Sequence, residues 1–142
     1  MLFGLKRPCR ECPFRKASLK GYLGGDSYDP EAFINPLLNR HELAPGVFVS
    51  VGDVGDMACH MDIDNALEHV RNEFDIDEPE VEDLDRCGIK LQHCAGALHF
   101  LSTSCKMPWD KTKVAAMDEV VAHTKEPMIK HFHEFVAHHS KK

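Results

Sequence analysis

The sequence predicts a small, mostly α-helical domain with a minor β component, organised around a metal site with four cysteine ligands. Three observations indicate this: apolar residues recur at helical spacing, there is one short β-rich run, and a Cys-x2-Cys pair lies near the start of a chain with six cysteines. The 142 residues, 43% hydrophobic and 28% charged, are typical of one folded domain. A domain of this length buries roughly two thirds of its unfolded surface, so the cysteines are not needed merely as staples.

The first half of the chain is expected to hold one helix and one strand. Residues 1–25 predict a loop, because prolines and glycines interrupt any regular apolar spacing. Asp29 as N-cap and Pro30 at the first helical position predict a helix start, and Pro36 predicts a bend or restart of that helix. Residues 46–51 are rich in β-branched side chains and predict a short strand.

The second half of the chain is expected to be helical. Asp64 predicts the cap of a helix, whereas residues 75–86 have the composition of an exposed acidic connector. The apolar stretch 89–101 is compatible with a helix, Asp110 predicts a further cap, and Pro127 predicts the start of the last helix. We expect the histidines of that last segment to lie on a solvated or partner-facing surface: His131, His133, His138 and His139.

The net charge of −6 is concentrated in one segment. Residues 62–86 contain 11 acids and 2 bases, a net charge of −9, so the remainder of the chain is slightly basic. We therefore expect a metal-centred domain over 1–106 with an acidic insert at 62–86, and a helical extension over 107–142 packed on it. The first twenty residues offer a basic face for a protein partner or nucleic acid, made of Lys6, Arg7, Arg10, Lys16 and Lys20.

Neither a secretory signal nor a membrane span is expected. The N-terminal residues include no apolar segment before their charges, and no window approaches 18 uninterrupted apolar residues. These features favour a cytoplasmic protein that does not bind a membrane. In a reducing compartment, six cysteines indicate ligands, redox thiols or core residues rather than three disulfides.

The strongest local motif is the pair Cys9 and Cys12, followed by a proline. Two cysteines separated by two residues can turn both sulfurs toward one metal ion, and thiolates suit zinc, copper(I) or iron–sulfur centres. Such a site needs two further ligands. Cys59, which follows a glycine-rich break, and Cys94, which precedes small residues, have the better context. The other candidates look incidental or are neighbouring imidazoles: Cys87, Cys105, His60 and His93.

Four blocks of the sequence together resemble a family of small, functionally uncharacterised bacteriophage and bacterial proteins. The blocks are Cys-x2-Cys-Pro-Phe-Arg from Cys9, Gly-Tyr-Leu-Gly from Gly21, Cys-His from Cys59 and Cys-Ala-Gly-Ala-Leu from Cys94. The resemblance implies that Cys9, Cys12, Cys59 and Cys94 are the family's cysteines, with His60 beside them. It also implies a host cytoplasm if the protein is phage-encoded, and it brings no known activity. The acidic insert and the long C-terminal part depart from the shorter members.

The spacing of the four cysteines favours a [4Fe–4S] cluster, with Zn²⁺ as the alternative. Most small zinc modules use two chelating pairs, whereas here one pair is joined by two distant single cysteines. Either centre with four thiolates has a net charge of −2, which nearby cations such as Arg15 would offset. We expect His60 to donate a hydrogen bond near the site, or to replace one ligand.

Other chemistries fit the sequence less well. A thioredoxin-like role is weak because only eight residues precede Cys9, and adjacent His93 and Cys94 would not face each other as a catalytic pair. His133 and His138 are five residues apart, too many for a zinc-protease motif. We therefore assign no catalytic residue and expect an accessory or regulatory metal protein that acts on nucleic acid or a nucleic-acid-processing partner. The alternatives are a zinc-stabilised interaction module and a redox-active iron–sulfur protein.

Overall fold

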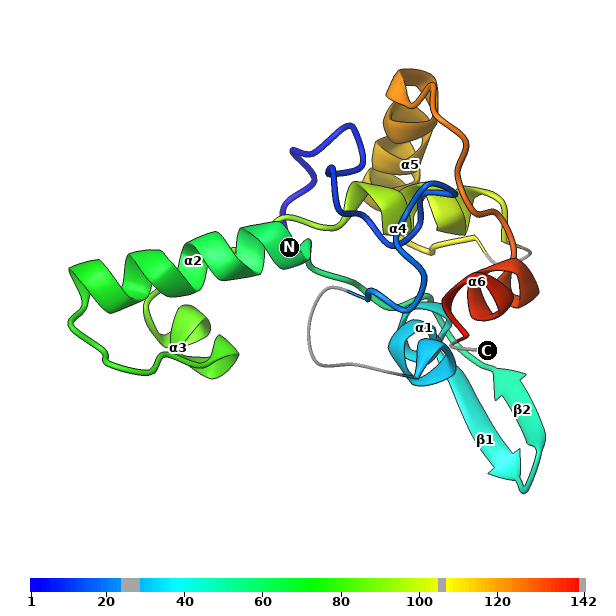
Figure 1. The fold of residues 1–142 in the computed structure, drawn as a ribbon, viewed down its shortest axis with the longest axis horizontal. Coiled ribbons are helices and arrows are strands. Elements are labelled where there is room, and N and C mark those ends of the chain that lie inside the picture. Colours follow the sequence, from blue (N-terminus) through cyan, green and yellow to red (C-terminus); the bar gives the residue numbers. More distant parts are fainter. Residues whose placement is uncertain (24–28, 105–106, 141–142) are drawn as a thin grey trace.

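The fold is mostly helical with a minor β component (Figure 1). A computed structural model describes residues 1–23, 29–104 and 107–140. Within these ranges it contains six helices and one two-stranded antiparallel sheet. The elements in chain order are α1 (Pro30–Leu38), β1 (Arg40–Ala44), β2 (Val47–Ser50), α2 (His60–Glu73), α3 (Val81–Arg86), α4 (Ala95–Ser102), α5 (Lys111–His123) and α6 (Phe132–His139).

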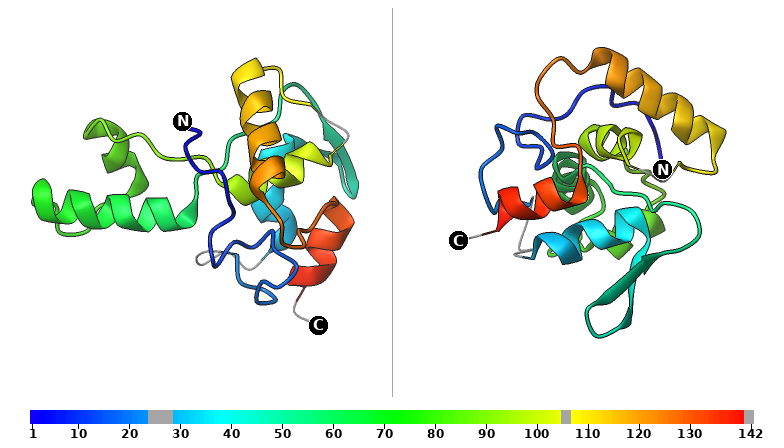
Figure 2. Two further views of the ribbon diagram at one scale, coloured as in Figure 1. Left: turned by 90° about the horizontal axis from the view of Figure 1, so that it is seen from above. Right: turned by 90° about the vertical axis from the view of Figure 1, so that its right-hand side faces the viewer.

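Helix α4 lies at the centre of the core. Six of its eight residues are buried, because small and apolar side chains cover nearly its whole surface. Phe14 of the N-terminal loop packs against Phe100 of α4 and Phe135 of α6, with ring centroids 5.4 and 5.0 Å apart. Helix α5 packs on α4, and α6 packs on α1 (Figure 2). The C-terminal helices therefore share one core with the N-terminal loop.

The N-terminal loop pairs with the segment before α6, and this pairing corrects the predicted helix start. The backbone N–H of Ile129 donates to the carbonyl of Phe14 at 2.7 Å, and Arg15 and Met128 form an antiparallel bridge. Because residues 127–129 are extended, the last helix begins at Phe132 instead of at the predicted Pro127. Tertiary pairing outweighs the local preference of proline for a helix start.

Helix α1 and the hairpin follow the sequence closely. The Asp29 side chain accepts a hydrogen bond from the N–H of Glu31, which confirms the predicted cap. The helix does not restart at Pro36, which lies in its last turn, and it ends in a left-handed Asn39 with φ of 51°. The β-rich run forms β2, and its partner β1 was not predicted.

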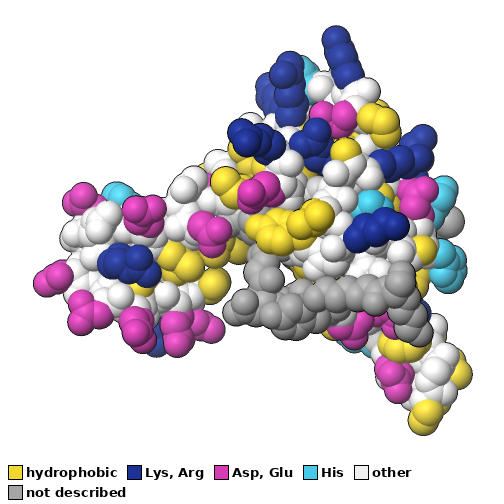
Figure 3. All heavy atoms as spheres, viewed as in Figure 1, with side chains coloured by type: hydrophobic (Ala, Val, Ile, Leu, Met, Phe, Trp, Pro, Cys, Tyr) yellow, Lys and Arg dark blue, Asp and Glu magenta, His cyan; other side chains and the backbone are white. Residues whose placement is uncertain are grey.

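Helices α2 and α3 form an arm that projects from the body (Figures 1 and 2). Helix α2 begins at His60, four residues before the predicted cap at Asp64. The predicted acidic connector contains α3. A capping box between Glu80 and Asp83 begins that helix, and its Leu84 side chain is buried. Acidic side chains gather on the surface of this arm (Figure 3).

The remaining predicted helices are partly confirmed. Asp110 caps α5 by accepting a hydrogen bond from the N–H of Thr112 at 2.9 Å. The apolar stretch 89–101 becomes helical only from Ala95, because the residues before it pair with another segment. None of the helices in the described ranges has the length and apolar character needed to span a bilayer.

Candidate metal centre

Two extended segments bring Cys59 and Cys94 into one short backbone pairing. Ala58 and His93 form an antiparallel bridge. The N–H of Cys59 donates to the carbonyl of Gln92 at 3.0 Å, and the N–H of Cys94 donates to the carbonyl of Met57 at 2.7 Å. Cys59 and Cys94, 35 positions apart in sequence, thus lie diagonally across this pairing, each one residue away from the Ala58–His93 bridge.

The predicted Cys pair forms a tight turn. The N–H of Cys12 donates to the carbonyl of Cys9 at 3.2 Å, which directs both side chains to the same side. Cys12 is fully buried and Cys9 is half-buried at the edge of the core. The turn therefore supplies one inner and one outer thiol.

The four predicted thiols meet as a chain. Hydrogen bonds link the side chain of Cys59 to Cys9, Cys9 to Cys12, and Cys12 to Cys94. None of the four forms a disulfide. Hydrogen bonds with the Cys9 and Cys94 thiols, together with burial, raise the pKa of Cys12 well above its ordinary value. Three segments that are distant in sequence thus converge on one group of sulfur atoms.

Cys59 is the N-cap of α2, so the positive end of that helix faces its sulfur. Its hydrogen bond with Cys9 and its burial raise the pKa of the thiol, whereas the backbone N–H groups of Asp62 and Met61 act in the opposite direction. These N–H groups have no partner within the first turn of a helix. They are therefore available to a thiolate.

Cys94 occupies the same position at α4 and is the thiol most prepared to ionise. The hydrogen bond from the Cys12 thiol lowers the pKa of Cys94, and the N–H groups of Ala97 and Gly96 lower it further against the effect of burial. Helix N-termini favour negative charge for this reason. Two helices therefore direct their positive ends at one group of thiols.

Gly96 allows the first turn of α4 to approach the Cys pair. A Cβ atom at this position would lie 2.1 Å from the sulfur of Cys12 and 3.2 Å from Cβ of Phe14. Only glycine leaves room for that approach. The small residues after Cys94 are thus explained by contact with the opposite thiol.

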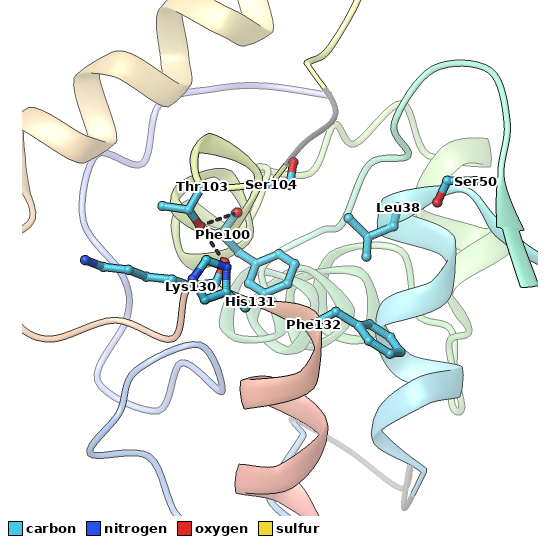
Figure 4. Close-up of a pocket in the computed structure, with 8 residues that line it drawn as sticks. All are labelled: Leu38, Ser50, Phe100, Thr103, Ser104, Lys130, His131 and Phe132. Atoms are coloured by element: carbon cyan, nitrogen blue, oxygen red, sulfur yellow. Dashed lines mark hydrogen bonds between the residues drawn. The ribbon is translucent and has the colours of Figure 1, made fainter.

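An apolar pocket of about 260 Å³ adjoins Cys94. Its other lining residues come from the N-terminal loop, α1, α2 and the segment before α2: Pro13, Leu23, Phe33, Met57, Ala58 and Ile63. Space beside a ligand thiol can accommodate a group that is larger than a single ion. This pocket is separate from a larger one of about 540 Å³ between Phe100, Leu38 and Phe132, which contains no cysteine in its described lining (Figure 4).

A buried polar network supports the segment that bears Cys59, and sequence reasoning missed it. The Nε2 atom of His93 accepts the N–H of Met57 at 3.3 Å, and its Nδ1 atom donates to the carbonyl of Cys94 at 3.0 Å. Lys113 of α5 is buried and donates to Asp56 and to the carbonyl of Gly55, both at 2.6 Å. Lysine seldom lies in a core, so the sequence does not indicate that the Lys113 side chain is buried.

Burial lowers the pKa of His93, which keeps the imidazole neutral in the tautomer that these two hydrogen bonds require. Burial raises the pKa of Asp56, but the hydrogen bond and positive charge of Lys113 outweigh burial and lower the pKa below its usual value. The network therefore contains a neutral imidazole and one ion pair.

The predicted companions of the site have mixed placements. Helix α2 begins at His60, but the His60 side chain lies outside the part of the chain that the structure describes. The guanidinium of Arg15 donates to the carbonyl of Arg10 at 2.9 Å and lies 3.6 Å from Glu126, so it supports the loop that carries the pair. Cys105 also lies outside the described residues. All five predicted basic-face residues are exposed: Lys6, Arg7, Arg10, Lys16 and Lys20.

The expected surface position of the C-terminal histidines is wrong for His139. It is fully buried, accepts the N–H of Gly21 at Nδ1 and donates from Nε2 to the carbonyl of Pro13 at 2.8 Å. His138 contacts both the hydroxyl and the carbonyl of Ser18. These two imidazoles fasten α6 to the loop that bears the Cys pair.

The thiols do not form a ready coordination shell. In the described ranges, no three His, Cys, Asp or Glu side chains are arranged so that they could hold a metal ion as they stand. Three of the thiol pairs touch, and the chain of contacts is open at its two ends. No family model, curated protein or solved structure matches this chain.

Proposed function

We propose that Cys9, Cys12, Cys59 and Cys94 bind a metal centre, and that the protein is a small metal-containing accessory or regulatory protein. The convergence of four thiols from three segments, none of them in a disulfide, carries this proposal. Four thiolates are a sufficient ligand set for zinc or for an iron–sulfur cluster. Small side-chain shifts would close the open chain of thiols around such a group.

The local electrostatics support a negatively charged centre. A buried thiol is costly to ionise unless hydrogen bonds or positive charge compensate. Here the N-termini of α2 and α4 both end at the ligands, and backbone N–H groups lie at the sulfur atoms of Cys59 and Cys94. The same cradle would stabilise the net charge of −2 that either centre has with four thiolates.

A [4Fe–4S] cluster is the first candidate. The apolar pocket is lined by Cys94 and by none of the other three thiols, so a four-iron core, which is larger than one ion, would extend from the thiol group into this space. Four cysteine thiolates also satisfy the ligand needs of that core. The cluster would tie the N-terminal loop to the roots of α2 and α4.

Zinc is the second candidate, and the thiol contacts favour it. With Zn–S bonds of about 2.3 Å, tetrahedral geometry places sulfur atoms about 3.8 Å apart. That spacing suits thiols that already share hydrogen bonds. A zinc site would be structural, since all four positions would be filled by protein.

Anaerobic purification followed by metal analysis tests the proposal. We would measure iron, acid-labile sulfide and zinc per chain, and record the visible absorption spectrum. A brown protein with iron and sulfide in equal amounts supports the cluster, and reversible reduction would add a redox role. A colourless protein with one zinc per chain supports the zinc module. A stably folded protein that contains neither and takes up neither contradicts the proposal.

The role in nucleic-acid metabolism depends on the basic face. Exposed Lys6, Arg7 and Arg10 lie in the loop that carries the Cys pair, so a nucleic acid or its processing protein could sense the centre. Gel-shift titrations with duplex and single-stranded DNA at several salt concentrations test this. Affinity that falls with salt and with Arg7→Glu supports it, and no shift at low salt contradicts it.

A further inference from the structure

A second feature, independent of the metal centre, is an apolar groove at the root of the arm. The groove encloses about 370 Å³. We call it the arm groove; its lining residues are Met1, Val81, Leu84, Asp85, Ile89, Lys90 and Leu91. Val81 is 51% exposed in this groove, although a valine on a short helix normally faces a core. The groove is thus an apolar surface that lacks a cover among the described residues.

The surroundings of the arm groove are acidic. Three of its lining residues, Val81, Leu84 and Asp85, belong to the acidic insert, which has a net charge of −9. Exposed acids on α3 and just before it are Glu78, Glu80, Glu82 and Asp85. Among the described residues of the arm, Arg86 with Asp83 at 3.7 Å is the ion pair that offsets this charge. Lys90 and Met1 also line the groove, so its acidic side is the one that α3 forms, and that side favours an apolar side chain flanked by cations.

The same chain presents such a side chain in residues 16–20, which we call the Leu19 loop. Leu19 is 75% exposed, and Lys16 and Lys20 stand on either side of it. Hydrogen bonds between Ser18 and His138 hold this loop against α6. Lys16 also lies 4.0 Å from Glu134 of the same helix. The loop is therefore held in place with its apolar side chain in solvent.

The Leu19 loop cannot reach the groove of its own chain. The arm projects from one side of the body, whereas α6, to which the loop is fastened, lies on the other side (Figures 1 and 2). We propose that the arm groove binds the Leu19 loop of a second copy, so that copies associate head to tail. Each contact is small, and we therefore expect weak association that depends on concentration and on salt.

Sedimentation velocity over a concentration series tests the proposal. We expect association at about 0.05 M salt that weakens at about 0.5 M, where charges are screened more strongly. Leu19→Glu and Val81→Glu each place a carboxylate into the contact, and each should weaken association by about tenfold or more. Both side chains are exposed in the single chain, so neither change disturbs the core. Leu43→Glu, at another exposed leucine, is the matched control.

Mixing the two variants gives the decisive result. Leu19→Glu retains an intact groove and Val81→Glu retains an intact loop, so the mixture should form a heterodimer although neither variant self-associates. Metal content is matched in all samples, which separates this test from the fate of the metal proposal. A monomeric wild type overturns the proposal, as does a mixture that stays monomeric or a Leu43→Glu variant that dissociates equally. A monomer whose groove binds a synthetic lysine-rich amphipathic peptide through Val81 also overturns it, and assigns the groove to a different basic partner.

Discussion

The backbone N–H of Cys94 donates a hydrogen bond to the carbonyl of Met57, two residues before Cys59, at 2.7 Å. This bond sets the register between two segments whose cysteines each cap a helix. A shift of one residue would turn one thiol to the opposite face. Backbone pairing therefore sets the positions of these two cysteines relative to each other.

The first prediction compares two cysteines. Cys94→Ser removes a thiol from the buried group, whereas Cys87→Ser changes a half-buried cysteine at the end of α3. Loss of a structural metal is among the largest single-residue effects, so we expect Cys94→Ser to lose the metal and about 3 kcal/mol or more of unfolding free energy. Cys87→Ser should cost less than about 1 kcal/mol. Metal analysis and urea unfolding measure both, and equal effects would contradict the ligand assignment.

The second prediction concerns the closest approach in the site. Gly96→Ala places a Cβ atom 2.1 Å from the Cys12 sulfur, so α4 or the Cys pair must move. Overpacking of this kind costs about 1–3 kcal/mol, and we expect reduced metal content as well. Gly4→Ala is the control, because its Cβ would meet the end of the flexible Gln92 side chain at 3.0 Å. A Gly96→Ala protein with full metal content and wild-type stability would show that the approach is not needed.

The sequence predicts those parts of the fold that depend on contacts between residues close in sequence. It does not predict those that depend on contacts between distant segments. Local signals were sufficient for the caps at Asp29 and Asp110, because each cap is made by a side chain and an N–H two residues away. They failed at Pro127 and over 89–94, where pairing with distant segments keeps the backbone extended. The choice of Cys59 and Cys94 rested on glycines and small residues, which report close backbone approach.

Buried polar groups were harder to predict. Lysine is almost never fully buried and histidine is intermediate, and nothing in the sequence neighbours of Lys113 and His139 indicates their partners. His139 lies 126 positions from Pro13, the residue that accepts its hydrogen bond. Only the assembled fold reveals such pairs.

The third prediction tests the network beside Cys59. Lys113→Met retains most of the side-chain volume but removes the hydrogen bonds to Gly55 and Asp56. Because the Asp56 side chain is 55% exposed, water replaces much of its ion pair, and we expect a loss of about 1–2 kcal/mol. The pKa of Asp56 should rise, since Lys113 contributes most to lowering it. Urea unfolding and carboxyl NMR titration measure these effects, and an unchanged Asp56 pKa would contradict the assigned contact.

The fourth prediction is a loss of stability below neutral pH that depends on His139. Burial lowers the pKa of His139, so the unfolded chain binds a proton at higher pH than the folded chain does. The stability that neutral His139 contributes is fully present above about pH 6.5, the ordinary pKa of histidine. It is lost as the pH falls below that value. The protonated ring can no longer accept the N–H of Gly21. One proton changes stability by at most about 1.4 kcal/mol per pH unit.

Unfolding free energy measured across this pH range, for the wild type and for His139→Gln, tests that origin. Burial also lowers the pKa values of His93 and His99, so the wild-type slope is the sum of several imidazoles. His139→Gln should remove its share of the slope, and His133→Gln, at an exposed imidazole, is the matched control substitution. If His139→Gln kept the full wild-type slope, His93 and His99 would cause the acid sensitivity. The contact of α6 with the loop that bears the Cys pair would then not depend on the protonation of His139.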